Sequence, residues 1–200
     1  MYAIDERTVL RRYRTRTVPE AETAVMRHAR AAGYPVPELH SVSGHDLVLE
    51  RVDGPTMRQA LEREPSELER YARTFAALHE RLFMITAPAI LRAVGDGDTL
   101  LHLDFHPENV LMGTHGPMVI DWANAARGHW ADDVAMTVVI VKGVVLPEPL
   151  PTLARHFAEI YLASFDRHVV RAHLPMAIVR RARDPNLSAA EHQAAREVTV

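Results

Sequence analysis

The sequence predicts an α+β protein in two lobes: a small N-terminal sheet with one helix, and a larger, mainly helical C-terminal part. Strand-like runs flank one helical stretch before residue 54, whereas helical periodicity dominates from residue 55 onward. A β-hairpin pattern interrupts the helical part between residues 109 and 121. We therefore expect two units, residues 1–53 and residues 54–200.

The N-terminal unit is expected to contain two strands around one helix. Thr8–Arg14 has the β-branched and aromatic content of a strand, and Asp46–Val52 is a second strand that ends at a turn over residues 53–55. Between the strands, Pro19 stands where a helix tolerates proline and Gly33 closes the helix.

The C-terminal unit is expected to be helical on both sides of the hairpin. Apolar residues at i, i+3, i+4 and i+7 predict a helix over residues 67–83. Residues 131–142 predict a buried helix, although Thr137–Val141 is equally compatible with a strand. A further helix should follow the proline-rich break at residues 147–151. Three residue pairs have the spacing of capping boxes: Thr56 with Gln59, Ser66 with Glu69, and Ser188 with Glu191.

Composition argues against several classes of function. The formal net charge of −3 offers no basic footprint for nucleic acid or for a membrane surface. The chain has no cysteine, which excludes disulfides and thiolate metal sites. The N-terminus carries charge at once and does not have the pattern of a signal peptide, and the most apolar stretch is interrupted by Lys142 and Gly143. We expect a cytoplasmic protein, and the sequence leaves its oligomeric state open.

Three oxygen-bearing side chains are expected to gather around the hairpin. Asn109 is followed by an apolar run, a glycine-rich turn and a second apolar run that leads to Asp121. A register that pairs Met112 with Met118 sets the two ends of the hairpin opposite each other, about 4.5–5.5 Å apart. An amide oxygen and a carboxylate suit Mg²⁺. Asp104 lies shortly upstream and should point into the same space, which predicts a phosphoryl-transfer site.

This segment resembles the catalytic region of kinase-like phosphotransferases. The run from His102 to Asn109, HLDFHPEN, fits the pattern H-x-D-x-x-x-x-N, and its His-Pro resembles the aminoglycoside phosphotransferase and choline kinase family. Ile120-Asp121-Trp122 is similar to that family's version of the Asp-Phe-Gly element, and residues 128–135 resemble the segment that follows it. The resemblance implies a protein kinase-like two-lobe fold with a reduced N-lobe sheet and a mainly helical C-lobe.

The resemblance implies roles for four of these residues. Asp104 would be the base that positions a substrate hydroxyl, and Asn109 and Asp121 would bind Mg²⁺. His102 belongs to the same catalytic loop, although a structural hydrogen-bonding role suits it better than direct chemistry. Taken one by one, these residues could also be turn formers or hairpin caps, but that reading does not account for their pairing across the turn.

Other residues near the loop have less direct expectations. Asp133 would buttress the catalytic loop, with Asp132 as the alternative. Trp122 is expected to pack in the core against the hairpin. The position of His106 is compatible with a structural role and with a substrate-facing role, and the sequence does not separate the two.

The resemblance also implies an ATP site in the N-terminal unit. Arg11 stands at the position of the strand cation that reaches the phosphates, with Glu22 on the following helix as its partner. Arg12 and Arg14 remain alternatives, because strand register decides which side chain points inward. For each of these arginines, a solvated position on an edge strand is about as compatible with the sequence. The backbone of Glu50–Val52 would supply the adenine contacts.

The chain departs from the family at the phosphate cover. No glycine occurs before Gly33, and the chain begins at what would be the second strand. The glycine-rich loop of the family therefore has no counterpart in the sequence. Three explanations stay open: an N-terminally truncated sequence with a misplaced start, another cover, or impaired nucleotide binding.

These observations predict an ATP- and Mg²⁺-dependent phosphotransferase that acts on a hydroxyl of a small molecule. Aminoglycosides, amino sugars and choline-like alcohols stay open as acceptors, since residues after 150 form no clear acidic funnel for a polycation. One alternative is a non-catalytic kinase-like binding protein. Another is a metallohydrolase in which His102, Asp104 and His106 hold a metal, although it leaves Asn109 and Asp121 without a role.

Overall fold

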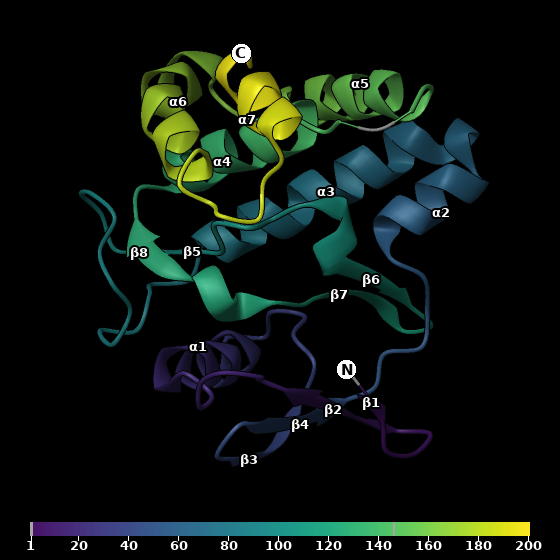
Figure 1. The fold of residues 1–200 in the computed structure, drawn as a ribbon, viewed down its shortest axis with the longest axis vertical. Helices are drawn as coiled ribbons and strands as arrows, with labels where there is room; N and C mark the ends of the chain where they lie inside the picture. The colour runs from purple at the N-terminus through teal and green to yellow at the C-terminus, as the bar shows by residue number, and fades with distance from the viewer. Residues whose placement is uncertain (1, 146) are drawn as a thin grey trace.

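The N-terminal lobe is a four-stranded antiparallel sheet with one helix beside it (Figure 1). The computed structural model describes residues 2–145 and 147–200. The strand order is β1-β2-β4-β3, and the sequence predicted only the two central strands. The strands are β1 (Tyr2–Ala3), β2 (Thr8–Arg12), β3 (Leu39–Ser43) and β4 (Asp46–Glu50).

Helix α1 (Glu20–Ala31) lies between this sheet and the helical lobe (Figure 1). The helix follows Pro19 and stops before Gly33, which has φ +79°, as the sequence predicts. Val25 of α1 is fully buried and joins Leu47 and Leu49 in the hydrophobic core. The two leucines are alternate residues of β4, so one face of this strand supplies the apolar surface. Each such side chain contributes about 1.5–3 kcal/mol on burial.

The segment between the two lobes passes close to the hairpin. A Cβ atom on Gly54 would lie 2.1 Å from the carbonyl oxygen of Met112, so only glycine fits there. One residue further on, the carbonyl of Pro55 accepts a hydrogen bond from the Met112 N–H at 2.8 Å. These contacts fix the crossing of the chain, and the expected boundary between residues 53 and 54 lies in this segment.

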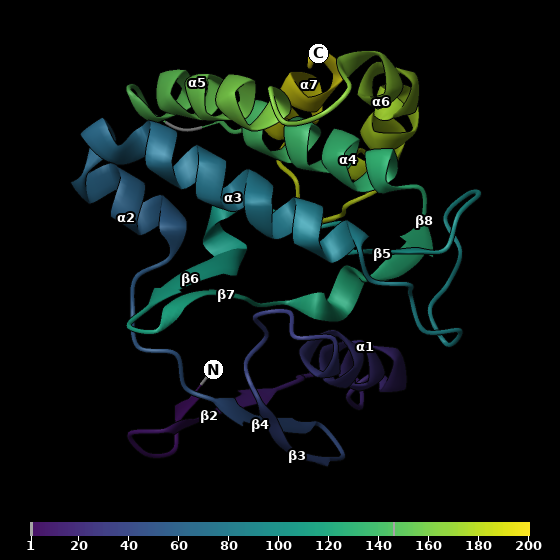
Figure 2. The same ribbon diagram turned by 180° about the vertical axis from the view of Figure 1, so that it is seen from behind.

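The C-terminal lobe is mainly helical, with its short strands on the side that faces the sheet (Figure 2). Helices α4 and α5 pack on each other, and α5 also packs along α3. The aromatic rings of Phe75, Phe105, Phe157 and Tyr161 cluster around these helices. The helices are α2 (Met57–Arg63), α3 (Leu68–Phe83), α4 (Trp130–Lys142), α5 (Leu150–Leu162), α6 (Arg167–Arg181) and α7 (Ala189–Arg196), with 3₁₀ turns η1 (Pro65–Glu67), η2 (Pro107–Asn109) and η3 (Trp122–Asn124).

The C-terminal lobe agrees with some of the expectations from the sequence and departs from others. Residues 130–142 form a helix and not a strand. The capping boxes at Thr56 and Ser188 are confirmed. The box at Ser66 is wrong: Pro65 starts η1, Ser66 lies within it, and α3 has no side-chain cap. Helix α6, which contains Pro175, was not predicted. Of the described residues, none forms a helix long and apolar enough to cross a bilayer.

The hairpin forms, but the predicted register is wrong by one residue. Strands β6 (Val110–Gly113) and β7 (Gly116–Val119) pair Val110 with Val119, and Gly113 with Gly116. The turn therefore has two residues and not five, because Gly116 takes φ +115° and allows a tight reversal. Asn109 then bonds across the hairpin to Ile120, whose N–H donates to the Asn109 carbonyl at 2.9 Å. Asp121 is not directly opposite Asn109.

Two further strands hold the start of the loop predicted to be catalytic, residues 102–109, which is called the catalytic loop below. Strand β5 (Thr99–Leu101) pairs antiparallel with β8 (Ala126–Gly128), so the segment after the hairpin returns beside the segment before the loop. Leu100 and Leu101 are fully buried. The loop that contains Asp104 therefore follows directly after a strand that is fixed by its pairing with β8 and by its buried leucines.

Candidate active site

Asp133 holds the start of the catalytic loop. Its side chain comes from the first turn of α4 and is fully buried. Oδ2 accepts the N–H of His102 at 2.6 Å, and Oδ1 accepts the N–H of Leu103 at 2.7 Å. Burial raises the pKa of Asp133, but the nearby His79 and His102 outweigh burial and leave the pKa below its ordinary value. Asp133 therefore occupies the buttress position, whereas Asp132 pairs with His173 at 2.9 Å.

His79 supports the same carboxylate and was not predicted from the sequence. Its Nε2 lies 3.0 Å from Asp133 Oδ2, and its Nδ1 lies 2.6 Å from the Tyr161 hydroxyl. All three side chains are buried in the core of the lobe. The three residues lie on α3, α4 and α5, so a polar network joins three helices behind the loop.

Two residues in this region have a left-handed backbone. Leu103 has φ +59° and Asp121 has φ +64°, and no other described residue except glycine has a positive φ. This conformation costs about 1–2 kcal/mol for a residue with a side chain. At Leu103 the cost is offset by the bond to Asp133 and by a side chain that is only 2% exposed. Such strain is characteristic of functional sites, and here it falls beside Asp104 and on Asp121.

Asp104 is partly exposed and is surrounded by hydrogen-bond donors. Its Oδ1 lies 3.5 Å from His106 Nε2, and its Oδ2 accepts a long hydrogen bond of 3.5 Å from Asn124 Nδ2. Burial raises the pKa of Asp104, but the hydrogen bond and charge of His106, with the nearby His102 and Arg181, leave it below its ordinary value. The side chain is therefore an ionised carboxylate at neutral pH, the state in which it can accept a proton.

Asn109 is tied to the same turn through its nitrogen. Nδ2 donates to the backbone carbonyl of Asp104 at 2.9 Å and lies 3.2 Å from His106 Nε2. Within the described residues its Oδ1 makes no hydrogen bond. The amide is thus oriented by the loop, with its oxygen left for another partner.

The His102 ring is placed for the structural hydrogen-bonding role that the sequence favoured over direct chemistry. The ring is fully buried, and Nε2 lies 3.0 Å from the carbonyl of Ile120. A carbonyl only accepts hydrogen bonds, so Nε2 carries the proton. Burial lowers the pKa of His102, which favours the neutral ring. The residue links the catalytic loop to the residue before Asp121.

Arg11 joins the two lobes at the other side of the site. Its guanidinium donates to Glu22 Oε1 at 3.0 Å and to Asp121 Oδ1 at 2.9 Å. The Glu22 side chain is 1% exposed and also accepts a hydrogen bond from the Tyr13 hydroxyl. Burial lowers the pKa of Arg11, but the charges of Asp121 and Glu22 raise it above its ordinary value. The expected partnership of Arg11 with Glu22 is present.

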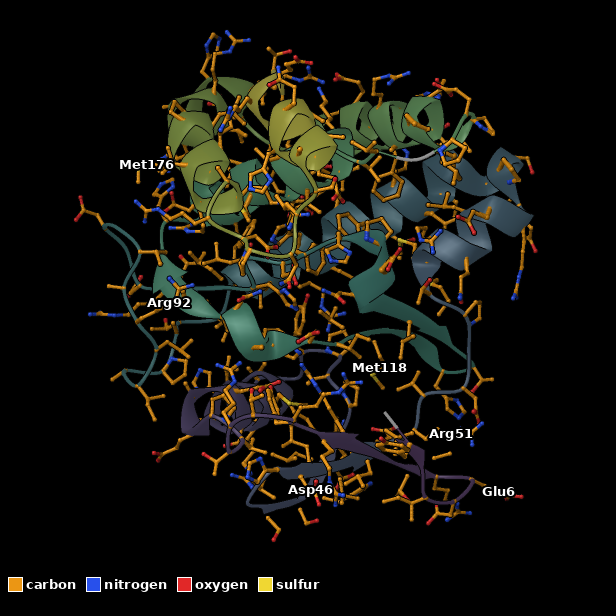
Figure 3. The ribbon with its side chains drawn as sticks, in the orientation of Figure 1. Glu6, Asp46, Arg51, Arg92, Met118 and Met176 are labelled. Atoms are coloured by element: carbon orange, nitrogen blue, oxygen red, sulfur yellow. The ribbon has the colours of Figure 1, made fainter. Side chains whose placement is uncertain are left out.

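The neighbouring arginines do not point into the site. Arg12 forms a two-pronged ion pair with Asp46, which lies on the side of the sheet remote from the helical lobe (Figure 3). Arg14 follows the end of β2 and is exposed. Strand register therefore selects Arg11, and the two alternatives from the sequence lie outside the site.

The linker backbone expected to contact adenine is only partly free. The N–H of Glu50 bonds to the carbonyl of Glu38 at 2.8 Å, and the N–H of Arg51 bonds to the carbonyl of Arg7 at 2.7 Å. Glu50 Oε2 accepts the N–H of Glu38 at 2.9 Å, so this side chain supports the sheet. No described residue bonds to the backbone of Val52. Val52 is thus the position of this segment with free backbone groups.

The geometry does not support the metallohydrolase alternative. No three His, Cys, Asp or Glu side chains in the described part of the chain are placed to hold one metal ion together. His102 is buried against a carbonyl, whereas His106 faces Asp104 and a cavity. Trp122 is in the core, as expected, and donates from Nε1 to the Val119 carbonyl at 3.1 Å.

The comparisons with known proteins agree with this arrangement. Residues 86–173 match the model of the phosphotransferase enzyme family (APH). No curated protein matches the chain in sequence. The resemblance to aminoglycoside phosphotransferases and choline or ethanolamine kinases, and the protein kinase-like fold, are confirmed.

Three solved structures illustrate the likeness of fold. Aminoglycoside phosphotransferase APH(4)-Ia is 15% identical, with 87% of this chain and 78% of that chain covered at a TM-score of 0.63. ADP-bound aminoglycoside phosphotransferase APH(2'')-Ib is 12% identical, with 96% and 86% covered at a TM-score of 0.63. Plasmodium vivax ethanolamine kinase is 10% identical, with 94% and 74% covered at a TM-score of 0.58.

Proposed function

We propose that this kinase-like chain is an ATP- and Mg²⁺-dependent phosphotransferase that transfers the γ-phosphate to a hydroxyl of a small molecule. One observation carries the proposal: Arg11 bridges a helix carboxylate, Glu22, and the hairpin-end carboxylate, Asp121. A cation on a strand, held by a buried glutamate and facing an aspartate of the opposite lobe, is the arrangement that phosphoryl transfer uses. Asp104 lies on the loop that Asp133 holds in place.

The donor set fits a magnesium ion. Asn109 offers an amide oxygen with no hydrogen-bond partner among the described residues, and Asp121 offers a carboxylate that is 40% exposed. Mg²⁺ is usually bound by one or two protein oxygens together with water and substrate phosphates. When bound, the ion would neutralise charge that develops on the phosphates. ADP in a solved relative supports nucleotide use, with Arg11 facing the phosphates and Val52 the base.

The remaining chemistry belongs to side chains of the chain itself. The ionised carboxylate of Asp104 orients the acceptor hydroxyl and takes its proton as phosphate transfers. Asn109 holds the turn through the Asp104 carbonyl, and neutral His102 fixes the distance between the loop and the hairpin end. Positioning and electrostatic stabilisation supply most of the catalysis in such reactions.

The acceptor is a small molecule with a hydroxyl group. The names of the similar structures suggest aminoglycosides and ethanolamine as first compounds to test, with amino sugars and choline-like alcohols beside them. Dependence on ATP agrees with the cytoplasmic location expected from the sequence.

Nucleotide binding and transfer can be measured separately on the full chain. Calorimetry with ADP and with a non-hydrolysable ATP analogue, each with and without Mg²⁺, should show binding that Mg²⁺ strengthens. ATP consumption against a panel of alcohols should then depend on the acceptor and on Asp104. Absence of nucleotide binding would refute the proposed function.

A second candidate function is a nucleotide-binding protein without transfer activity. The specific observation in its favour is the turn between β1 and β2, residues 4–7, which contains two carboxylates and no glycine. Asp5 accepts the N–H of Arg7 within this turn, so that backbone group is not free to bind a phosphate. Nucleotide binding with no acceptor-dependent turnover would favour this candidate.

A further inference from the structure

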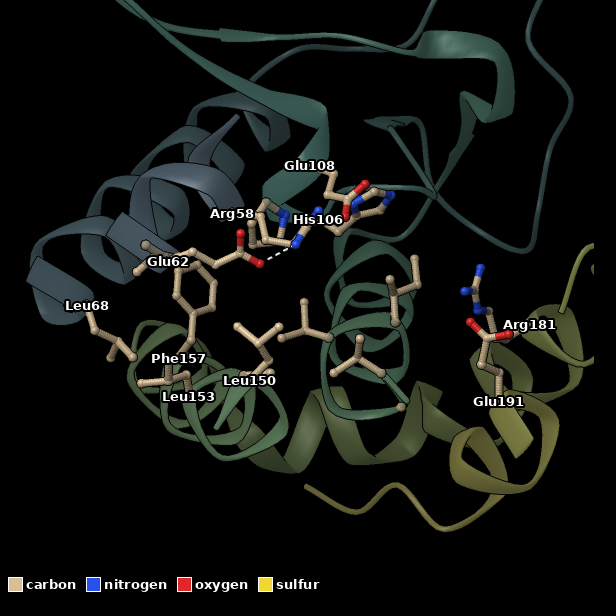
Figure 4. Close-up of a pocket in the computed structure, with 17 residues that line it drawn as sticks. Arg58, Glu62, Leu68, His106, Glu108, Leu150, Leu153, Phe157, Arg181 and Glu191 are labelled. Atoms are coloured by element: carbon tan, nitrogen blue, oxygen red, sulfur yellow. Dashed lines mark hydrogen bonds and ion pairs between the residues drawn. The ribbon is translucent and has the colours of Figure 1, made fainter. Parts of the chain in front are cut away.

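A cavity of about 310 Å³ lies in the helical lobe directly behind the catalytic loop (Figure 4). It is bounded by α2, α4, α5 and η2, and His106 and Pro107 form the wall on the loop side. The other walls are mainly apolar. They include the buried Leu68 and Phe157 and four half-buried side chains, Leu61, Ile140, Leu150 and Leu153.

The cavity is adjacent to the candidate base. His106 lines the cavity, and its Nε2 lies 3.5 Å from Asp104 Oδ1. Arg181 lines the far wall, and its charge contributes to the lowered pKa of Asp104. A molecule with a hydroxyl at Asp104 would therefore have its remaining atoms next to this space.

The charged side chains around the cavity already have partners. Arg58 forms ion pairs with Glu62, on the same helix, and with Glu108, on the turn of the catalytic loop (Figure 4). Glu191 accepts two hydrogen bonds from Ser188, at 2.8 and 2.7 Å. Arg181 pairs with Asp184 at 3.2 Å, outside the cavity lining.

This pairing decides which ligands fit. An ammonium group that leaves water needs a carboxylate that is free to replace its hydration. Glu62 and Glu108 share the cation Arg58, and Glu191 accepts from Ser188, so a polyamine would have to compete with existing partners. An uncharged apolar body only covers surface that is already poorly hydrated, and apolar walls with few polar groups are typical of sites for such molecules.

We propose that the cavity binds the uncharged hydrocarbon body of the acceptor while its hydroxyl lies at Asp104. The acceptor class is then a compact apolar alcohol, and neither a polyamine nor a quaternary ammonium alcohol. This inference rests on the proposed phosphotransferase function and narrows its acceptor.

Binding and transfer with matched probes test the inference. Menthol, cyclohexanol, choline and kanamycin would be titrated into the full chain with Mg·ADP, and then supplied as acceptors with Mg·ATP. We expect menthol to bind best and to have the highest kcat/KM. Failure to bind Mg·ADP refutes the proposed function itself, and the acceptor role of the cavity with it.

Variants locate the bound alcohol. Ala154 lines the cavity from α5, so Ala154→Phe would fill it and should raise the KM for menthol about tenfold or more. Ala163→Phe, an exposed change just after the same helix, is the matched control and should leave KM unchanged. The Kd for Mg·ADP should stay within about twofold in both, because neither residue lies near Arg11 or Val52 in the proposed site.

A second variant covers the case in which Ala154→Phe does not fold. Ile140→Ala enlarges the cavity and should increase the ratio of kcat/KM for menthol to kcat/KM for cyclohexanol relative to wild type. Nucleotide-dependent turnover that prefers kanamycin or choline and does not respond to either cavity variant overturns this inference while the proposed function stands.

Discussion

The two halves of the candidate site are stabilised in different ways. The catalytic loop is held from inside the helical lobe, where Asp133 binds two consecutive backbone N–H groups and Phe105 is fully buried. The nucleotide half belongs to a sheet whose strands β1 and β3 are largely exposed. There, a single inward arginine joins the sheet to α1 and to the other lobe.

The difference shows which part of the geometry is independent of ligand. Buried hydrogen bonds to a charged group are costly to break, so the loop keeps its shape whatever else is bound. Of the two ion pairs of Arg11, the pair with Asp121 is partly exposed and can exchange partners at little cost, whereas Glu22 is buried. Substitutions can therefore separate the chemistry, the fold and nucleotide affinity.

Asp104→Asn should remove transfer and leave the fold intact. The amide keeps the shape of the side chain but cannot accept the hydroxyl proton, so kcat should fall about 10²–10⁴-fold. The side chain is partly exposed and bonded only through long contacts, so Tm and Mg·ADP affinity should change little. Steady-state ATP consumption, thermal unfolding and calorimetry measure the three quantities. Full turnover in this variant would remove Asp104 from its role.

Asp133→Asn should destabilise the protein, in contrast to the first substitution. The carboxylate accepts two backbone N–H groups and pairs with His79, whereas an amide has only one acceptor oxygen. Breaking a buried charged network costs about 3–5 kcal/mol of unfolding free energy. Urea unfolding measures the change. Asp132→Asn is the matched control: its pair with His173 is partly exposed, and we expect less than about 1 kcal/mol. Equal effects of the two substitutions would contradict the assignment.

The same carboxylate predicts a pH dependence of stability. Because the pKa of Asp133 is lowered in the folded protein, its contribution is complete above the unfolded-state pKa of about 3.9 and is lost as the pH falls through the folded-state value. The difference in unfolding free energy between wild type and Asp133→Asn should therefore be constant at neutral pH and shrink in acid. A difference that grows on acidification would show that folding raises the pKa of Asp133, contrary to this prediction.

Arg11→Gln should weaken nucleotide binding without unfolding the chain. Loss of the cation that faces the phosphates should raise the Kd for Mg·ADP about tenfold or more. This change corresponds to the loss of one charged hydrogen bond, which contributes about 1.5–3 kcal/mol. Arg12→Gln, one residue along the same strand and paired with Asp46 on the outer side, is the control and should leave Kd unchanged. Calorimetry on both variants distinguishes the inward from the outward arginine.

His106→Phe should have the smallest effect, on the acidity of Asp104. The ring would still line the cavity, but the hydrogen bond and charge that lower the pKa of Asp104 would be lost, so that pKa should rise. The ¹³C chemical shift of the Asp104 carboxyl group, followed against pH by NMR, measures it. An unchanged titration would show that His106 does not act on this carboxylate.

Local sequence patterns predicted those features that depend on local rules. The helix after Pro19 and the capping box at Ser188 each depend on residues within a few positions of one another. The family resemblance located Arg11 and Glu22, which form their ion pair, whereas the strand pattern alone left Arg12 and Arg14 open.

Other features depend on contacts that no local pattern reveals. The observed register of the hairpin differs from the predicted one because Gly113 and Gly116 allow a two-residue turn. The sequence does not show where within a glycine-rich stretch the chain reverses. His79 reaches Asp133 and Tyr161, which are distant in sequence, so nothing nearby marks it as part of the site. Helix α6 was missed because Pro175 interrupts its pattern while the surrounding lobe keeps it helical.

The bridge made by Arg11 implies that filling the site is an exchange of partners. The guanidinium neutralises Asp121, so this carboxylate is not left with an uncompensated charge. On the proposed function, an incoming ion would compete with that guanidinium for Asp121, and an incoming phosphate would offer the guanidinium a new partner. On the proposed function, metal and nucleotide should therefore enter together more readily than either alone.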